Sequence, residues 1–319
     1  MPTPEPRLPS IEDLKAAHER IRARLLPTPL LAARSEDAPL WLKPENLQRT
    51  GSFKFRGAYH KLARLDPDVR ARGVIAYSSG NHGQGVACAA QIFGCPATIV
   101  MPQGAVQEKV DGILRYGARV IQCEGGSDER RRIAEELSAQ DGIAIVPPYD
   151  DIEIVMGQAS VGIEIAQERP TIRQVLVPVG GGGLLSGVAL AVRTLLPDAR
   201  IVGVEPAGAD DLYRSLRAGE HVRLPSVDTI ADGLRTQSVG EVNYRILREA
   251  VDEVVTVTDA EILEACRALL LTEKLVVEPS GAVTLAAFRS GRVPRGLETA
   301  AVLSGGNISR DVLRSLLGH

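Results

Sequence analysis

The sequence predicts an α/β protein built from parallel sheets that carry helices on both faces. Two observations predict this class. Short runs that are apolar throughout alternate with longer segments of helical periodicity, and most runs stop at Gly, Ser or Asn. Strands of a parallel sheet are buried on both faces and are therefore apolar without alternation. With 319 residues, the chain is long enough for two such domains.

The first elements are a capped helix and a short strand. Ser10 can cap a helix whose third residue is Asp13, which is the spacing of a capping box. We expect Pro27 and Pro29 to end this helix, because proline does not continue one. The apolar run Leu40-Trp41-Leu42 predicts the first strand.

The next element is a helix that begins near a lysine. Ser52 can cap a helix that carries Phe55, Tyr59 and Leu62 at helical spacing. Lys54 then lies in the first turn. The positive end of the helix dipole disfavours a protonated amine there, so the position is a poor one for an ordinary surface lysine.

Seven further apolar runs predict strands, and helical patterns separate most of them: residues 74–77, 97–100, 119–121, 143–146, 175–177, 200–204 and 300–303. Ligands of such sheets bind beyond the carboxyl ends of the strands. Ser78, the glycine run at Gly180, Glu205 and Ser304 all follow a predicted strand. We therefore expect these residues on one side of the molecule.

The composition excludes several classes of protein. Hydrophobic residues make up 44% of the chain, charged residues 24%, and the formal net charge is −3, as in many soluble globular proteins. No basic run is long enough to follow a nucleic-acid backbone. The arginines at 130, 131 and 132 predict a solvated, ion-paired helix face, because glutamates flank them.

The sequence also indicates where the protein works. No segment approaches the roughly 18 apolar residues that cross a membrane. The proline-rich N-terminus lacks the pattern of a secretion signal, and no two cysteines have CxxC spacing. We therefore expect a cytoplasmic protein with reduced thiols, no membrane partner and no nucleic-acid partner.

Two features suggest a cofactor. A buried lysine such as Lys54 is a candidate Schiff-base amine, because desolvation lowers its pKa. The four glycines from Gly180 precede an apolar helix and form a candidate phosphate cradle. Pyridoxal phosphate has both an aldehyde and a phosphate. The alternatives are a surface lysine with a flexible loop, and a dinucleotide-binding loop, although the spacing beyond Gly182 does not fit the latter.

An ordered set of motifs resembles the fold-type II pyridoxal-phosphate enzymes, in particular the serine/threonine dehydratase and serine racemase group. The matching segments are residues 43–46, 50–57, 78–84, 157–158, 178–183, 205–206, 230–233, 278–279 and 304–307. The resemblance implies two doubly wound three-layer α/β domains, tryptophan synthase β-like, with pyridoxal phosphate between them. The large domain would comprise residues 1–72 and 151–319, and the small domain residues 73–150.

The resemblance also implies which residues bind the cofactor. Lys54 would hold it as a Schiff base and act as the base for the substrate's α-proton. Ser304 would face the pyridine nitrogen, which favours elimination over transamination because a hydroxyl leaves that nitrogen neutral. A helix N-cap is the alternative role of this serine. The implied cofactor-binding residues are Phe53, Lys54, Asn81, Gly180, Gly181, Gly182, Gly183, Leu184, Gly233 and Ser304.

The implied substrate-binding residues are Ser78, Ser79, Asn81, His82 and Gln158. In racemase-like members, a serine at position 79 lies on the cofactor face opposite the lysine. Proton transfer at both faces permits inversion at Cα, so Ser79 makes racemisation a possible activity of this enzyme. A turn serine that bonds local backbone is the alternative. His82 can likewise be a helix-start residue bonded to backbone, and Tyr149 and Arg131 are further candidates to face the pocket.

In the racemase-like branch, Glu205, the carbonyl of Ala209 and Asp211 correspond to a divalent-cation site. Two carboxylates and a carbonyl are hard oxygen ligands that suit Mg²⁺, with Ca²⁺ or Mn²⁺ as alternatives. A solvated acidic turn is the other interpretation, because Asp210 and Asp211 are adjacent.

Taken together, the resemblance implies a deaminating dehydratase, or ammonia-lyase, that converts L-threonine or L-serine to a 2-oxo acid and ammonia. A serine racemase, a 3-hydroxyaspartate dehydratase or a β-replacement synthase for cysteine are alternatives on the same scaffold. A non-catalytic nucleotide-binding or regulatory module is the alternative from another class. We expect a homodimer, and we expect it to lack a C-terminal regulatory domain after the helix that follows Ser304.

Overall fold

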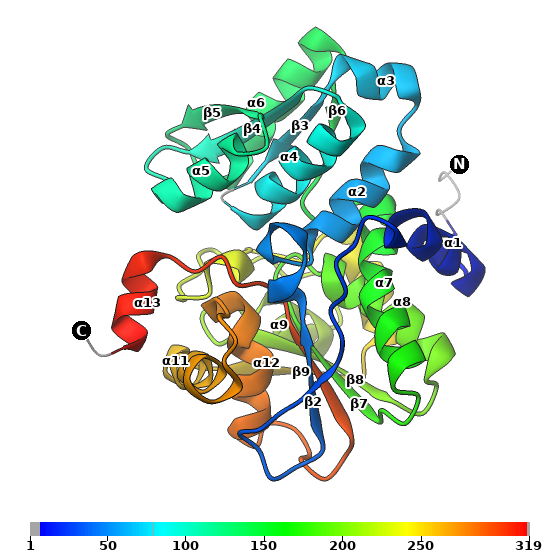
Figure 1. The fold of residues 1–319 in the computed structure, drawn as a ribbon, viewed down its shortest axis with the longest axis vertical. Coiled ribbons are helices and arrows are strands. Elements are labelled where there is room, and N and C mark those ends of the chain that lie inside the picture. The colour runs from blue at the N-terminus through cyan, green and yellow to red at the C-terminus, as the bar shows by residue number, and fades with distance from the viewer. Residues whose placement is uncertain (1–6, 79, 318–319) are drawn as a thin grey trace.

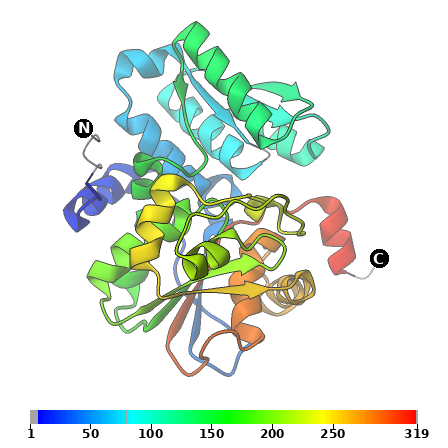
Figure 2. The same cartoon turned by 180° about the vertical axis from the view of Figure 1, so that it is seen from behind.

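The computed structural model describes residues 7–78 and 80–317, which form two sheets with helices on both faces (Figure 1). The larger sheet has the strand order β1-β2-β10-β7-β8-β9 and the smaller one β5-β4-β3-β6. Helices α1 and α13 lie on opposite sides of the molecule (Figure 2). The predicted α/β class with parallel sheets is confirmed.

The larger sheet is parallel except for β1, which pairs antiparallel with β2. Its strands are β1 (Leu31–Ala32), β2 (Leu40–Pro44), β7 (Gln174–Pro178), β8 (Arg200–Pro206), β9 (Glu253–Val257) and β10 (Thr299–Leu303). The helices around it are α1 (Ile11–Arg22), α2 (Lys54–Arg64), α7 (Ile152–Glu168), α8 (Gly183–Leu195), α9 (Asp211–Ala218), α10 (Glu241–Ala250), α11 (Asp259–Ala268), α12 (Pro279–Arg289) and α13 (Arg310–Leu316).

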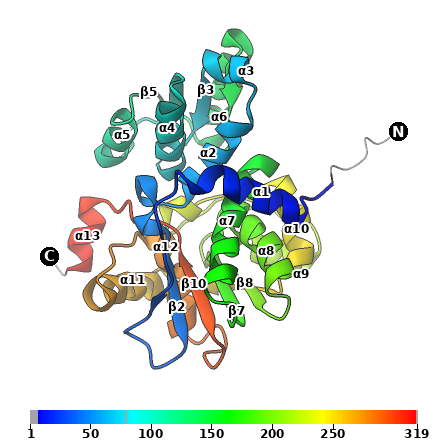
Figure 3. The same cartoon turned by 45° about the vertical axis from the view of Figure 1, so that its right-hand side comes forward.

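Successive side chains of the central strands enter two different hydrophobic cores. Val175 and Val177 of β7 pack with α7 and α8, whereas Leu176 packs with α11 and α12. Figure 3 shows these two helix pairs on opposite sides of the larger sheet. This double burial is the reason the strands are apolar without alternation.

The smaller sheet is wholly parallel, with strands β3 (Val74–Tyr77), β4 (Ala97–Pro102), β5 (Arg119–Cys123) and β6 (Ala144–Ile145). Helix α4 (Asn81–Phe93) contributes to the core on one face, and α6 (Ser127–Asp141) to the core on the other. Helices α3 (Pro67–Arg72) and α5 (Gln107–Leu114) complete this part. All four strands fall inside the predicted small domain, whose boundaries stay a prediction.

Two local predictions about helix ends are wrong. The capping box of Ser10 and Asp13 is present, but α1 ends at Arg22, before either proline is reached. Ser52 does not cap α2, which has Phe53 at that position and no side-chain cap. The backbone of Ser52 is instead extended and forms an antiparallel bridge with Gly305, so a contact distant in sequence overrides the local signal. Strands β1 and β9 were not predicted.

The two sheets direct their carboxyl ends at one cavity. Tyr77 at the end of β3, Gly180 after β7 and Ser304 after β10 all line it. The prediction that these loops lie together is therefore confirmed for them. Among the described residues, no helix is both long and apolar enough to span a bilayer.

Candidate functional site

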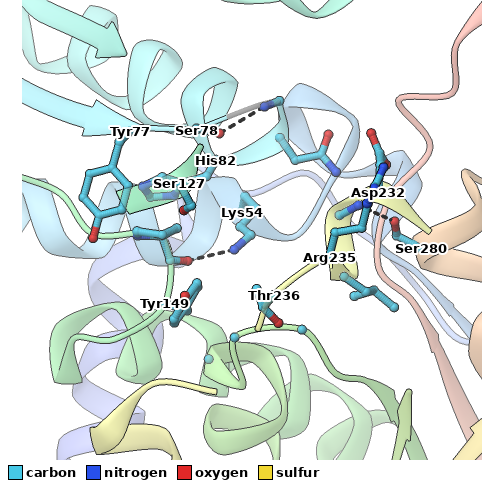
Figure 4. Close-up of a pocket in the computed structure, with 18 of the residues that line it drawn as sticks. Lys54, Tyr77, Ser78, His82, Ser127, Tyr149, Asp232, Arg235, Thr236 and Ser280 are labelled. Carbon is cyan, nitrogen blue, oxygen red and sulfur yellow. Dashed lines mark hydrogen bonds between the residues drawn. The ribbon is translucent and has the colours of Figure 1, made fainter. Parts of the chain in front are cut away.

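The cavity between the two sheets has a volume of about 930 Å³ and is lined by loops from both. Figure 4 shows Lys54, His82 and Tyr149 projecting into it, with Asp232 and Ser280 on the side away from Tyr77. The structure brings together most of the residues predicted to bind cofactor or substrate: Phe53, Lys54, Ser78, Asn81, His82, Gly180, Gly181, Gly182, Gly183, Leu184, Gly233 and Ser304.

Lys54 is the first residue of α2 and presents its amine to the cavity. Its Nζ donates a hydrogen bond to the carbonyl oxygen of Pro148 at 2.7 Å and lies 5.1 Å from the centre of the Phe53 ring. Burial lowers the pKa of Lys54 to about 8. A substantial fraction of this amine is therefore neutral near physiological pH, as nucleophilic attack on an aldehyde requires.

The glycine run connects β7 to α8 and leaves the N-terminus of that helix open to the cavity. Gly182 has φ +88° and precedes α8 without a side-chain cap, so the first N–H groups of the helix have no side-chain acceptor. A Cβ on Gly181 would lie 2.2 Å from the ring of Tyr149, so only glycine fits there. These open N–H groups and the helix dipole together favour a phosphate.

Asn243 holds the glycine loop from behind. Its side-chain amide donates to the carbonyl oxygen of Gly181 at 2.7 Å, and the backbone N–H of Gly240 donates to the same oxygen at 3.1 Å. With its carbonyl tied on that side, the loop has a fixed orientation. Sequence reasoning missed Asn243, because nothing local connects α10 with the glycine run.

Ser304 follows β10 directly and is 4% exposed. Its Oγ donates to the carbonyl oxygen of Ser280 at 3.3 Å, and Ser280 Oγ accepts the N–H of Gly233 at 2.8 Å. Helix α13 begins six residues later with Ser309 as its N-cap, so Ser304 does not cap a helix. Ser304 lines the cavity, and rotation of its hydroxyl away from Ser280 would let it donate to a heterocycle nitrogen.

Asn81 is oriented by two neighbours. Its Nδ2 donates to Glu278 Oε1 at 2.6 Å, and its Oδ1 accepts from Asn307 Nδ2 at 2.8 Å. Burial, together with the nearby charge of Asp232, raises the pKa of Glu278 to about 7, although the hydrogen bond from Asn81 opposes this rise. Glu278 and Asn307 lie in motifs noted in the sequence, but their role as supports of Asn81 was not foreseen.

The loop between β3 and α4 is held by Ser78, whose Oγ accepts the N–H groups of Gly80 and Gly83 at 3.1 and 3.0 Å. His82 lines the cavity but is 3% exposed, and its Nε2 lies 2.8 Å from the carbonyl oxygen of Val146. Burial, with the nearby charge of Lys54, lowers the pKa of His82 to about 3. The ring is therefore neutral and donates to backbone. Ser79 lies outside the described residues.

Two candidates point elsewhere. Gln158 is buried in α7 against α2 and is not among the residues that line the cavity; a Cβ on Gly57 would lie 2.4 Å from its Nε2. The missing side chain of Gly57 thus makes the room that Gln158 fills. Arg131 pairs with Glu135 at 3.0 Å on the exposed face of α6 and does not line the cavity.

Arg130 differs from its two arginine neighbours. Arg131 and Arg132 form ion pairs with glutamates, as predicted for a solvated face, but Arg130 lines the cavity. Its Nε is buried and has no hydrogen-bond partner, and burial lowers the pKa of Arg130. Because a helix advances 100° per residue, three consecutive arginines cannot share one face. The sequence reasoning applied one interpretation to all three and missed this one.

Glu205 near the end of β8 and Asp211 at the start of α9 lie close together, away from the cavity lining, and Ala209 is in the loop between these elements. Glu205 accepts the N–H groups of Leu212 and Tyr213 at 3.0 and 2.8 Å, and Asp211 Oδ2 accepts that of Val239 at 2.6 Å. Burial raises the pKa of Glu205, the charge of Asp211 raises it further, and burial raises the pKa of Asp211 to about 7.

A divalent cation fits this donor set. Asp211 Oδ1 is buried and has no hydrogen-bond partner. In the part of the chain that the structure describes, no three His, Cys, Asp or Glu side chains are grouped as a metal site. A cation here would therefore depend on two carboxylates, the Ala209 carbonyl and water, which suits a hard ion such as Mg²⁺.

Comparison with known proteins gives the family. The family described as pyridoxal-phosphate dependent enzyme matches residues 21–305. The chain is 41% identical over 316 residues to an L-threo-3-hydroxyaspartate ammonia-lyase of Pseudomonas sp, covering 98% of this chain and 99% of the relative. It is 42% identical to a serine racemase of Arabidopsis thaliana, with 93% of each covered.

A solved structure agrees with these matches. The crystal structure of a threonine deaminase from T.th. superimposes with a TM-score of 0.89 and 44% sequence identity, covering 94% of this chain and 99% of that one. The chain therefore belongs to the pyridoxal-phosphate dependent enzyme family, with the fold-type II architecture that the motifs predicted. The cofactor is pyridoxal phosphate, and the buried amine and glycine cradle fit its aldehyde and its phosphate.

Proposed function

We propose that this enzyme is an ammonia-lyase with L-serine or L-threonine as substrate. It eliminates water from the 3-hydroxy amino acid, and hydrolysis of the resulting imine takes up a water and gives a 2-oxo acid and ammonia. The observation that carries the proposal is the meeting of Lys54 with the glycine cradle in one cavity. Pyridoxal phosphate supplies an electron sink for the Cα–H bond that breaks. The ammonia-lyase and deaminase names of the relatives support the same reaction.

The residues of the chain would divide the remaining work. The amine of Lys54 holds the cofactor's aldehyde carbon and accepts the α-proton, tasks helped by its lowered pKa. The N–H groups at the start of α8 hold the phosphate. Ser304 offers a hydroxyl rather than a carboxylate to the ring nitrogen, so elimination is favoured over transamination. The turn that begins at Ser78 would receive the substrate carboxylate through backbone N–H groups.

A second candidate substrate is a dicarboxylic one, L-threo-3-hydroxyaspartate. Arg130 favours it, because its buried Nε lacks a partner and the guanidinium fits a second carboxylate. The likeness to the Pseudomonas enzyme of that name supports it. Racemisation of serine is a third outcome, and it rests on the predicted role of Ser79 and on the likeness to the Arabidopsis racemase.

We further propose that Mg²⁺ binds at Glu205, Ala209 and Asp211, that the enzyme is a cytoplasmic homodimer, and that the domain boundaries are those expected from the sequence. The unpartnered Oδ1 of Asp211 supports the cation. We expect it to stabilise the protein rather than to take part in the chemistry.

The deciding experiment is a product assay. The enzyme is incubated with L-serine, D-serine, L-threonine and the diastereomers of 3-hydroxyaspartate, and 2-oxo acid, ammonia and the opposite enantiomer are measured. We expect 2-oxo acid and ammonia in equal amounts from at least one L-substrate. If none of them yields 2-oxo acid, the proposal is wrong, and formation of the enantiomer alone would make the enzyme a racemase.

The side-chain preference is tested with Arg130→Met and with Arg131→Met as the matched control. Loss of a charged hydrogen bond costs about 1.5–3 kcal/mol, so Arg130→Met should lower the ratio of kcat/KM for hydroxyaspartate to that for serine about 10- to 100-fold. Arg131 pairs with Glu135 on the surface, and its change should leave the ratio the same. An unchanged ratio in Arg130→Met would reject the dicarboxylic candidate.

A further inference from the structure

An ion pair crosses the cavity between the two sheets. Lys109 on α5, beside the smaller sheet, pairs with Asp232 in the short helix of residues Asp232–Leu234, beside the larger sheet. Both residues line the cavity, and Figure 4 shows Asp232 next to Ser280. The Lys109 side chain is 14% exposed and that of Asp232 is 43% exposed. The pair is therefore shielded from water on its lysine side.

Each partner also contacts a loop that the proposed function uses. The side chain of Lys109 lies over Gly80: a Cβ added there would be 3.1 Å from Lys109 Cδ. Position 80 belongs to the turn proposed to receive the substrate carboxylate. Asp232 precedes Gly233, whose N–H is held by Ser280 Oγ at 2.8 Å. One ion pair thus connects the turn proposed to bind the substrate carboxylate, beside the smaller sheet, with the segment at Gly233 that is proposed to contact the cofactor, beside the larger sheet.

Other ion pairs between these two halves are more exposed. Arg223 and Asp128 are 57% and 81% exposed at 3.1 Å, and Arg310 and Glu108 are 81% and 41% exposed at 3.3 Å. Exposed pairs of this kind contribute little, because water and salt screen them. Of these three pairs, the one with the least exposed cation, Lys109 with Asp232, lines the cavity.

We infer that Lys109 and Asp232 are positioning residues whose ion pair holds the two walls of the cavity in the arrangement that binds substrate. We call this ion pair the clasp. Their side chains need not touch the reacting atoms. When the pair is broken, the walls separate for a larger fraction of the time, and the apparent affinity for substrate falls by that fraction.

The kinetic test uses Lys109→Met, Asp232→Asn, Lys109→Arg and the exchanged double variant Lys109→Asp/Asp232→Lys in the cofactor-loaded enzyme. We expect KM for the amino acid to rise about tenfold in Lys109→Met and Asp232→Asn, with kcat changed less than threefold. Lys109→Arg keeps the charge and should restore KM to within threefold.

Glu108→Gln is the matched control, since it breaks the exposed pair with Arg310 on the same helix. Its KM should equal the native value. The inference is overturned if KM is unchanged in both single variants, or if Lys109→Arg is as impaired as Lys109→Met. The double variant should have a lower KM than either single variant, and a higher one would also overturn it.

A second readout does not depend on turnover. The kinetic arm rests on the proposed function, whereas hydrogen exchange at the Gly233 amide reports the clasp in any folded enzyme. We expect exchange at that amide to be several-fold faster in Lys109→Met than in Glu108→Gln. Faster exchange without any 2-oxo acid product would reject the proposed reaction and retain the clasp. Unchanged exchange would reject the clasp.

Discussion

The two walls of the cavity are built in different ways. The wall on the larger sheet presents backbone where the cofactor phosphate would bind: the glycine loop and the start of α8, with the turn at Gly233 beside them, are held by hydrogen bonds such as that from Asn243. The wall on the smaller sheet presents long side chains, among them Arg130, Tyr77 and Lys109. A backbone wall suits a fixed cofactor, whereas side chains can change to suit a substrate without altering the fold.

Helix α2 connects the two walls. It packs against α4 on the side of the smaller sheet and against α7 on the side of the larger one. Lys54 starts this helix, so the reactive amine lies where both walls can act on it. The comparison therefore predicts how strongly substitutions affect the enzyme. The effect should be greatest at Lys54, smaller in the backbone wall, and smaller still for the groups behind that wall.

Replacement of Lys54 by alanine should have the largest effect. Because this amine would hold the cofactor and move the α-proton, we expect turnover to fall at least about 1000-fold, and the borohydride-trapped adduct of pyridoxal phosphate to disappear. Lys61→Ala is the matched control. It removes a partly exposed lysine of the same helix, which pairs with Asp151, and should keep both the turnover and the trapped adduct. An adduct that persists in Lys54→Ala would contradict the assignment.

The backbone wall is tested by Gly181→Ala. The added Cβ would lie 2.2 Å from the Tyr149 ring, so the ring or the loop must shift. Overpacking of this kind costs about 1–3 kcal/mol, and cofactor affinity should fall about 5- to 150-fold in an absorbance titration with pyridoxal phosphate. Gly296→Ala meets nothing within 4 Å and is the control. Equal affinities for the two variants would show that the wall tolerates side chains.

The carboxylates behind the backbone wall are tested with magnesium. A ligand at about 100 times its Kd stabilises the folded state by about 2.7 kcal/mol, so Mg²⁺ should raise Tm by several degrees in thermal unfolding. Asp211→Asn should abolish most of this rise. Asp198→Asn is the control, because Asp198 is 75% exposed and pairs with Arg173 at the surface. If Mg²⁺ does not raise the Tm of the native protein from which metal was first removed by chelation, the cation is ruled out.

The smallest expected effect is a change of pH dependence. A neutral amine attacks the aldehyde, so the rate at which the cofactor-free protein binds pyridoxal phosphate should rise with pH and level off above about 8, the pKa of Lys54. An ordinary lysine would give a rate that rises to about pH 10. Stopped-flow absorbance measures the rate. A continued rise beyond pH 9 would show that burial does not lower this pKa.

The sequence predicted features that depend on neighbouring residues. Apolar runs identified all but two of the ten strands in the described residues, and the missed ones are the edge strands β1 and β9. Strand β1 has only two residues, which are partly buried or exposed, so it is shorter than the runs by which strands are recognised. The glycine run and Lys54 were recognised because their chemistry requires those residue types whatever surrounds them.

By itself, the sequence determined the α/β class through its periodicity, and the lysine with its phosphate cradle through residue type. It gave the family through an ordered set of motifs that resembles known members. Only the tertiary structure decided that Arg130 faces the cavity, that Gln158 fills the space beside Gly57, and that Ser52 bridges to Gly305. The physical reason is that the direction of a side chain and the pairing of an extended backbone depend on segments remote in sequence.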